Sequence, residues 1–234
     1  MLNKKTTFQR AHGKIDVKIN NDEINRFYQS GSAKVFYPKS SQKFKELVLV
    51  NTAGGITSGD NFSYNFEIVN RSKIFLTTQT AERAYKGFNE QAKIKISLTV
   101  DDTSNLFWIP QELILFNNCN FDRNIEVNLS PNSNFVLAET TIFGRTAMGE
   151  YLEKGYFNDN WRINMNKNLI HAEALNLNGN IKDTLSNIAS AKDGVAISNI
   201  FIYGKKLLSY ENTLPEILRN SETVLSVSYT HLRA

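Results

Sequence analysis

The sequence predicts a mainly β protein, a stacked body of strands in a sandwich or solenoid-like arrangement with about two short α-helices. Three observations support this class. Apolar residues recur at every second position in many short segments, which is the pattern of a strand with one buried face. Turn-forming residues separate these segments. The strands also follow one another with few helical patterns between them, as in sandwiches and stacked β-bodies.

The strand-like segments extend from near the N-terminus to residue 203. The alternation is clearest at 15–19, 62–68, 94–100 and 125–129, where apolar and polar side chains take turns. In chain order the remaining segments are 34–37, 47–50, 74–78, 106–109, 135–138, 150–157, 161–165 and 195–203. Strands of this length and number need only short connections between them, so we expect one stacked body.

Turn signals separate several of these strands. They are Ser-Pro at 130–131, Asn-Asp-Asn at 158–160 and Asn-Gly at 178–179. Asparagine, aspartate, glycine and proline each favour turn conformations for their own steric or hydrogen-bonding reason. We therefore predict that residues 150–165 form a hairpin around the turn at 158–160.

Helical periodicity is limited to two places. Segment 181–191 puts Leu185 and Ile188 on one side, with Ala189 beside them. Segment 213–220 has a stronger apolar face, and proline is acceptable in the first turn of a helix. These two segments are the short helices of the predicted fold.

The composition indicates one folded domain over residues 1–227. Apolar residues make up 41% of the 234, which is enough for a core, and no linker or internal repeat interrupts them. Residues 228–234 complete the string VSYTHLRA, which resembles translated cloning adaptor. We expect this tail to be non-native. It would then replace the true C-terminus.

Charge and cysteine content narrow the function classes. The net charge is +4, but the lysines are scattered rather than gathered in a basic stripe, which disfavours nucleic acid as a partner. Cys119 is the only cysteine, so no disulfide framework forms within the chain. The N-terminal residues lack the apolar region of a signal peptide, and no run is long enough to span a membrane. We expect a cytoplasmic protein without a membrane partner.

The glycine-rich segment NTAGGITSGD, residues 51–60, is the most distinctive part of the chain. Gly54 and Gly59 have the spacing of a nucleotide-binding P-loop, but Asp60 and Asn61 stand where Lys and Ser or Thr are needed. An acid at that place would repel phosphate. The residues alone favour a structural corner between strands over a ligand loop.

The candidates for metal chemistry are acids rather than soft ligands. The three histidines lie far from one another and from Cys119, which excludes a tight nitrogen- and sulfur-ligated site within one chain. Five acids near strand ends, with waters, are suited to weak and exchangeable binding of divalent ions. They are Asp60, Glu82, Glu112, Glu139 and Glu150. The alternative for each is solvation, or pairing with Arg83, Arg123 or Arg145.

No motif for covalent catalysis is present. The nucleophile motif G-x-S-x-G is absent, and Cys119 has no histidine nearby in sequence. A pair of carboxylates for glycoside hydrolysis stays open, because separation in space cannot be read from the sequence. Two alternatives follow, a β-solenoid hydrolase using two of the five acids named above and an all-β carbohydrate-binding module using Trp108 and Trp161. Their apolar neighbours favour core positions for both tryptophans.

Four segments in register resemble the family of urease accessory proteins called UreD or UreH. They are NTAGGITSGD (51–60), LTTQTAERAYKG (76–87), WIPQELILF (108–116) and ETTIFGRTAMGE (139–150). The resemblance covers nearly the whole chain up to the suspect tail. It implies a mainly β body of stacked strands with two helices. It also implies a final segment that contacts the accessory protein UreF, in the region where this chain carries the tail.

The resemblance implies a chaperone rather than an enzyme. Members join UreF and the GTPase UreG on apo-urease and help to deliver nickel, so GTP belongs to the partner GTPase alone. The resemblance also implies an internal polar passage for nickel, with no tightly bound cofactor. Carried over residue by residue, the candidates for transient nickel contact are Asp60, Glu82, Glu112, Glu139 and Glu150. Arg145 and Thr78 are expected to support the walls of the passage.

Overall fold

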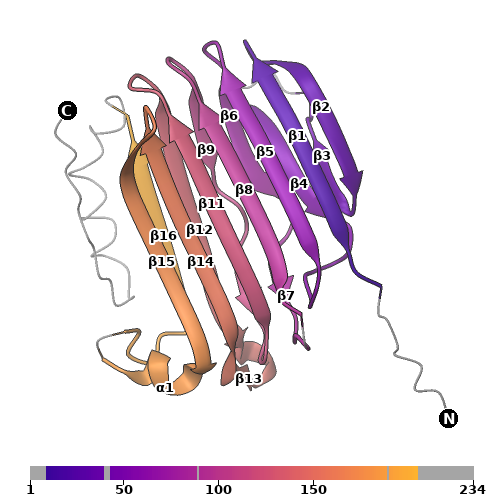
Figure 1. Ribbon diagram of the computed structural model, residues 1–234, viewed down its shortest axis with the longest axis vertical. Helices are drawn as coiled ribbons and strands as arrows, with labels where there is room; N and C mark the ends of the chain where they lie inside the picture. The colour runs from indigo at the N-terminus through magenta and orange to yellow at the C-terminus, as the bar shows by residue number, and fades with distance from the viewer. Residues whose placement is uncertain (1–8, 40–42, 89, 189, 205–234) are drawn as a thin grey trace.

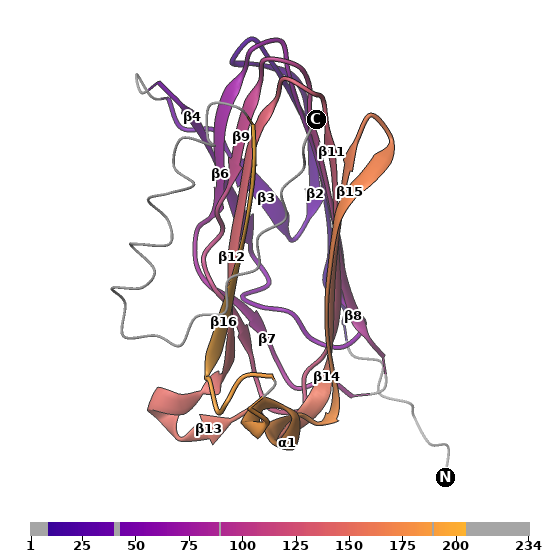
Figure 2. The same cartoon turned by 90° about the vertical axis from the view of Figure 1, so that its left-hand side faces the viewer.

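Two β-sheets lie face to face in the computed structural model of this chain (Figures 1 and 2). The structure describes residues 9–39, 43–88, 90–188 and 190–204. Sheet A has the strand order β15-β14-β11-β8-β5-β1-β2. Sheet B has the order β3-β4-β6-β9-β12-β10-β7, and β13 and β16 also pair with β12.

The strand bounds follow the alternating pattern closely. Those of sheet A are β1 His12–Asn20, β2 Glu23–Gly31, β5 Asn61–Val69, β8 Ala92–Val100, β11 Asn120–Leu129, β14 Lys154–Met165 and β15 Asn168–Asn180. Those of sheet B are β3 Ala33–Phe36, β4 Lys45–Asn51, β6 Lys73–Thr78, β7 Glu82–Ala84, β9 Asn105–Trp108, β10 Leu113–Leu115, β12 Asn134–Arg145, β13 Glu150–Tyr151 and β16 Ala196–Tyr203. The helical elements are the 3-10 turn η1 Thr146–Met148 and the helix α1 Ile181–Ser186.

The middle of the chain winds as a coil. It passes from β4 to β5, β6, β8, β9, β11, β12 and β14, moving between the two sheets at each long strand. Strands β5, β8, β11 and β14 therefore lie parallel and in register in sheet A, and β4, β6, β9 and β12 lie parallel in sheet B. The predicted stacked, solenoid-like β body is confirmed.

The connections that run from a sheet A strand to the next sheet B strand of the coil, from β5 to β6, β8 to β9 and β11 to β12, are short, and each contains a buried serine just before that next strand. Ser72, Ser104 and Ser133 have 0%, 0% and 1% exposure. The Ser72 and Ser133 hydroxyls donate to the carbonyls of Val69 and Ser130 at 2.6 and 2.7 Å. The coil thus repeats in geometry, although no motif recurs at a fixed spacing in the sequence.

The core fills the space between the sheets with the inward side chains of both. Along β5 and β8 every second residue is buried, as the alternation predicts. The largest fully buried side chains include Phe62, Phe66, Phe121, Phe135, Phe157 and Trp161. Burial of each contributes about 2–3 kcal/mol, so the two sheets are held mainly by this shared apolar layer.

Two predicted turns are wrong. Residues 158–160 lie in the middle of β14, which runs unbroken from Lys154 to Met165. Residues Asn178 and Gly179 lie within β15, where Gly179 adopts φ 73°. The hairpin is formed instead by β14 and β15, which pair antiparallel from Lys154–Asn180 to Met165–Asn168.

One of the two predicted helices falls within the described residues, and it is shorter than predicted. One α-helix is present, α1, and it ends at Ser186 instead of extending to 191. The side chain of Asn180 accepts a hydrogen bond from the Asp183 N–H and so caps its start. The predicted helix at 213–220 and the suspect tail at 228–234 lie outside the described residues. Within the described residues, no helix has the length and apolar character needed to cross a membrane.

Candidate functional site

The long connections of the coil gather at one end of the stack, where Figure 1 places β7, β13 and α1. This follows from the topology, because each chain segment that leaves a sheet B strand must return to sheet A at the same end. The connections are 52–60, 79–91, 109–119 and 146–153. They contain most of the distinctive segments of the sequence.

Glu82 lies at a small polar cavity at this end. The cavity has a volume of about 60 Å³ and is lined by residues of four strands and their ends, including Asn51, Tyr64, Thr78 and Glu82. The Asn51 amide donates to both carboxylate oxygens of Glu82 at 3.2 Å and to the Gly55 carbonyl at 3.0 Å. A space of this size holds one ion with about one or two waters.

Near neutral pH, Glu82 is present in both its protonated and its ionised form. The pKa of Glu82 is raised to about 7, mainly by burial and to a smaller extent by the charge of Asp60, while hydrogen bonds from Asn51 and the Arg83 N–H and the charge of Arg83 oppose the shift. Burial also raises the pKa of Tyr64 above its ordinary value, and the charge of Glu82 adds to that effect. Tyr64 therefore stays a neutral hydroxyl, whereas Glu82 gains or loses a proton close to pH 7.

Asp60 fixes the glycine-rich corner. Its carboxylate accepts the Ala11 N–H through Oδ1 and the Thr57 N–H through Oδ2, both at 2.8 Å. It therefore ties the start of β1 to the turn before β5. Gly55 is needed here because it adopts φ 145° and a Cβ would lie 2.9 Å from the Arg83 carbonyl. The sequence-based preference for a structural corner agrees with this geometry.

Glu139 belongs to a second polar group, buried between the sheets. Arg123 of β11 forms a two-pronged pair with Asp159 of β14, through Nε at 2.9 Å and Nη2 at 2.6 Å. The same Nη2 lies 2.5 Å from Glu139 Oε2 of β12. Trp108 donates to Glu139 Oε1 at 2.5 Å, and Trp161 donates to Asp159 Oδ2 at 3.3 Å.

This cluster, Arg123, Glu139 and Asp159, carries two carboxylates and one guanidinium. Burial raises the pKa of Glu139; Arg123 opposes that shift, and Asp159 adds to it. Burial disfavours the charged guanidinium, but Asp159 and Glu139 together keep the pKa of Arg123 above its ordinary value. All three side chains are buried. The sequence pattern offered Arg123 as a partner for the acids but missed Asp159, because Asn-Asp-Asn is typical of a turn.

Glu150 and Arg145 form a pair at the same end as the Glu82 cavity. The guanidinium of Arg145 contacts Glu150 Oε2 and lies over the Phe116 ring, 4.3 Å from its centre. Glu150 Oε1 accepts the Asn117 N–H at 3.0 Å. The pair thus fixes the turn after β12 against the segment before β11.

Thr78 and Glu112 lie beside the cavity. The Thr78 hydroxyl accepts the Gln111 N–H at 2.9 Å and donates to the Thr80 carbonyl at 3.1 Å. Glu112 has an exposed side chain, and its backbone carbonyl accepts the Glu82 N–H at 2.9 Å. The structure thus places Glu82 and Thr78 at one cavity, with the charge of Asp60 acting on Glu82, and it puts Glu139 in the separate buried cluster.

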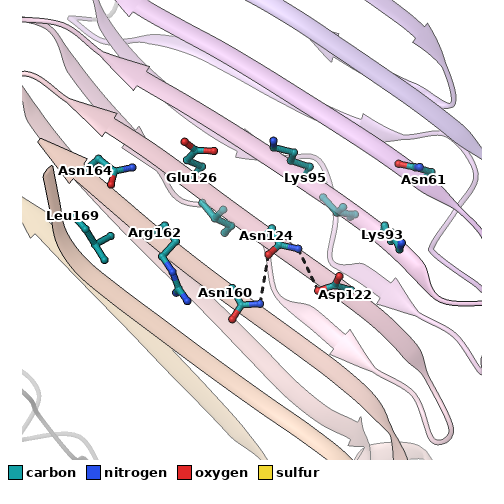
Figure 3. Close-up of a pocket in the computed structure, with 12 residues that line it drawn as sticks. Asn61, Lys93, Lys95, Asp122, Asn124, Glu126, Asn160, Arg162, Asn164 and Leu169 are labelled. Carbon is teal, nitrogen blue, oxygen red and sulfur yellow. Dashed lines mark hydrogen bonds between the residues drawn. The ribbon is translucent and has the colours of Figure 1, made fainter. Parts of the chain in front are cut away.

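A wider hollow lies elsewhere, on the outer face of sheet A, with a volume of about 660 Å³ (Figure 3). Asp122 and Glu126 line it from one strand, β11. Four residues of a strand span about 13 Å, more than the 5–9.5 Å that separates the carboxyl groups of glycosidases. This pair, which is not among the five acids named from the sequence, does not suit glycoside hydrolysis.

The carbohydrate-binding alternative also loses its named residues. Trp108 and Trp161 are each 2% exposed and donate hydrogen bonds inside the core. Neither ring presents a face on which a sugar could stack. The expectation that both tryptophans belong to the core is confirmed.

The described part of the chain offers few side chains that could bind a metal ion together. No group of three or more histidine, cysteine or acidic side chains lies close enough there to hold an ion. Cys119 is buried, and burial raises the pKa of its thiol to about 12, so it is not a thiolate ligand at neutral pH. Any ion at Glu82 would be bound by one carboxylate with neutral oxygens and water.

Comparison with known proteins identifies the family. A family model described as UreD urease accessory protein matches residues 10–233. The chain belongs to the UreD family of urease accessory proteins. Among its relatives, the urease accessory protein UreD of Rhodopseudomonas palustris (strain BisB5) is 38% identical over 197 residues, covering 82% of this chain and 70% of the relative.

Further members of the family give similar figures. The UreD protein of Mesorhizobium japonicum is 33% identical over 195 residues, covering 83% of this chain and 70% of the relative. That of Chelativorans sp. (strain BNC1) is 37% identical over 175 residues, covering 73% and 63%. The resemblance inferred from the four segments is confirmed, and it implies a role in urease maturation.

Proposed function

We propose that this chain is a non-catalytic chaperone that joins UreF-like and UreG-like partners on apo-urease and assists nickel insertion into the urease active site. Nickel is the cargo, and GTP is bound by the partner GTPase. The proposal rests on family membership together with one structural observation, the polar cavity at Glu82. We place this work in the cytoplasm, since the chain has a single cysteine and no disulfide framework.

The chemistry of the cavity suits a transient ion. Glu82 supplies one carboxylate, and Thr78 and Tyr64 supply neutral oxygens along the wall, while the Asn51 amide nitrogen holds the carboxylate in place. A site with one charge and no imidazole or thiolate holds a divalent ion weakly, together with some of its water. Weak binding is what a passage requires, because a tightly held ion would not move on.

The other acids take different parts in this proposal. Asp60 adds negative charge beside Glu82, while both of its oxygens hold backbone N–H groups. Glu112 is exposed next to β7, where it can attract a hydrated cation. Glu150 is paired with Arg145 and shapes the rim. Glu139 lies in the buried cluster, so a nickel ion would meet it only deeper in the body.

Glu82→Gln is expected to lower nickel-dependent activation of urease by about tenfold, because it removes the only carboxylate of the cavity while keeping the volume and the Asn51 contact. Activation is measured as urease activity after reconstitution from apo-urease, the accessory proteins and Ni²⁺. The matched control is Glu126→Gln on the outer face of sheet A, which should activate normally. Equal activation by both variants would remove Glu82 from the passage.

The outer face of sheet B offers a surface for a protein partner. Strand register places Phe75, Phe107, Val136 and Ile202 in one outward row across four strands. Ile200 is 51% exposed in the next row. A continuous apolar strip on a sheet face is typical of an interaction site rather than of free surface. We assign it to the UreF-like partner.

Ile200→Lys is expected to abolish capture of the UreF-like partner, because a charge in the middle of an apolar contact leaves a desolvated, unpaired ammonium. Co-purification from cells that express both proteins measures this. Asn124→Lys adds the same charge on the outer face of sheet A and should leave capture unchanged. Loss of capture in both variants, or in neither, would argue against this surface.

A further inference from the structure

The Arg123 cluster has the geometry of a cation site whose ion is replaced by a side chain. One atom, Arg123 Nη2, lies 2.6 Å from Asp159 Oδ2 and 2.5 Å from Glu139 Oε2. Divalent ions bind carboxylate oxygens at about 2.0–2.6 Å. The guanidinium nitrogen therefore occupies the place between two carboxylates that a metal ion would take.

The carboxylates come from both sheets, so the cluster bridges the core. Asp159 belongs to β14 of sheet A, and Glu139 to β12 of sheet B. The two indole N–H groups each donate to one carboxylate and hold it in place. The rigid setting resembles a prepared ligand pair more than a flexible surface pair.

The charge of the cluster is not fully balanced. Two buried carboxylates face a single guanidinium, and Asp159 takes both of its well-oriented N–H donors. Glu139 Oε2 is buried and has no hydrogen bond of good geometry, although it contacts Nη2. Apart from this contact the oxygen has no partner, so removal of the guanidinium would leave its lone pairs open to a cation.

We propose that Arg123 is a built-in counter-ion that closes the Glu139–Asp159 position to divalent cations. Neutralising Arg123 would turn the two carboxylates into a divalent-cation site. The effect on nickel rests on the proposed function: a nickel ion that passes Glu82 cannot bind to Glu139 while the guanidinium is in place. Arg123 is a positioning residue in this scheme.

Isothermal titration of the full chain with Ni²⁺, and separately with Mn²⁺, tests the proposal without urease. Glu139→Gln should bind both ions as the unchanged protein does. Arg123→Gln should gain one equivalent of bound ion with an affinity at least about tenfold higher, and Arg123→Gln/Glu139→Gln should lose that gain. Arg26→Gln is the matched control, because Arg26 bridges Asp16 and Glu67 on the exposed outer face.

Each outcome decides. Loss of ion binding in Glu139→Gln alone would show that the carboxylate is already open, which overturns the inference. A folded Arg123→Gln without the extra equivalent overturns it as well. If Arg123→Gln does not fold alone, added Mn²⁺ should restore its thermal unfolding transition, and it should not restore that of Arg123→Gln/Glu139→Gln. Absence of that rescue also counts against it. Failure of the proposed function would appear separately, as normal urease activation by Glu82→Gln.

Discussion

Arg123→Ala is expected to lower the free energy of unfolding by about 3–5 kcal/mol, one of the two largest stability effects that we predict for a single substitution in this chain. The guanidinium donates two hydrogen bonds to the Asp159 carboxylate and contacts Glu139 in the middle of the core. Its removal leaves two buried carboxylates without their counter-ion. Urea unfolding at pH 7, followed by circular dichroism, measures the change.

Arg26→Ala is the comparison that isolates burial. Arg26 also bridges two acids, Asp16 and Glu67, but its side chain is 42% exposed. Water solvates the acids once the arginine is gone, so the loss should stay below about 1 kcal/mol. Similar losses for Arg26→Ala and Arg123→Ala would mean that the buried cluster does not hold the sheets together.

The strands of the stack could be predicted from the sequence because most of them have one buried and one solvated face. In β5 and β8 this gives strict alternation over nine residues each. Strands β2 and β15 escaped prediction for the opposite reason. Both are edge strands that are exposed along much of their length, so apolar residues do not recur at every second position.

Asp159 shows how local turn chemistry can mislead. Asn158 and Asn160 face outward, where Asn158 donates to Asp122 at 2.8 Å and Asn160 to Asn124 at 3.5 Å. Amide rows between parallel strands thus use the residues that favour turns in isolation. The alternating pattern did contain the information, because Asp159 lies two residues from each of the buried Phe157 and Trp161 and so points to the same face of the strand.

The candidate site could be predicted only in part. Glu82 was named from its place after a threonine-rich strand, but its cavity is closed by Asn51, Tyr64 and Thr78 from other strands. The contact between Asn51 and Glu82 joins residues 31 positions apart. Strand register through the corners sets that distance, and no local pattern encodes it. The sequence likewise could not separate Asp60, which holds backbone N–H groups, from an acid that faces a cavity.

Glu82→Gln is expected to stabilise the protein at pH 8 by about 2–3 kcal/mol and to leave it unchanged at pH 4. Burial raises the pKa of Glu82 to about 7, from an ordinary 4.5. The folded state therefore binds a proton that the unfolded state has lost between these values. The stabilising contribution is complete below pH 4.5 and is lost as the pH rises through 7. Glutamine imitates the protonated form at every pH, so the difference between the two proteins should grow from pH 4.5 to pH 7 and level off above pH 7.

Urea unfolding of both proteins at intervals from pH 4 to pH 8 measures this difference directly, because all other titrating groups are shared and cancel. Glu112→Gln, with its exposed side chain, is the matched control for loss of a carboxylate and should change the free energy of unfolding at pH 8 by less than about 0.5 kcal/mol. Added Ni²⁺ should recover stability at pH 8 in the unchanged protein, since an ion that binds only the folded state stabilises it by mass action. It should not do so in Glu82→Gln. A difference that is flat from pH 4 to pH 8 would mean that Glu82 is solvated, and a solvated carboxylate could not select between a proton and a nickel ion in the way that the passage requires.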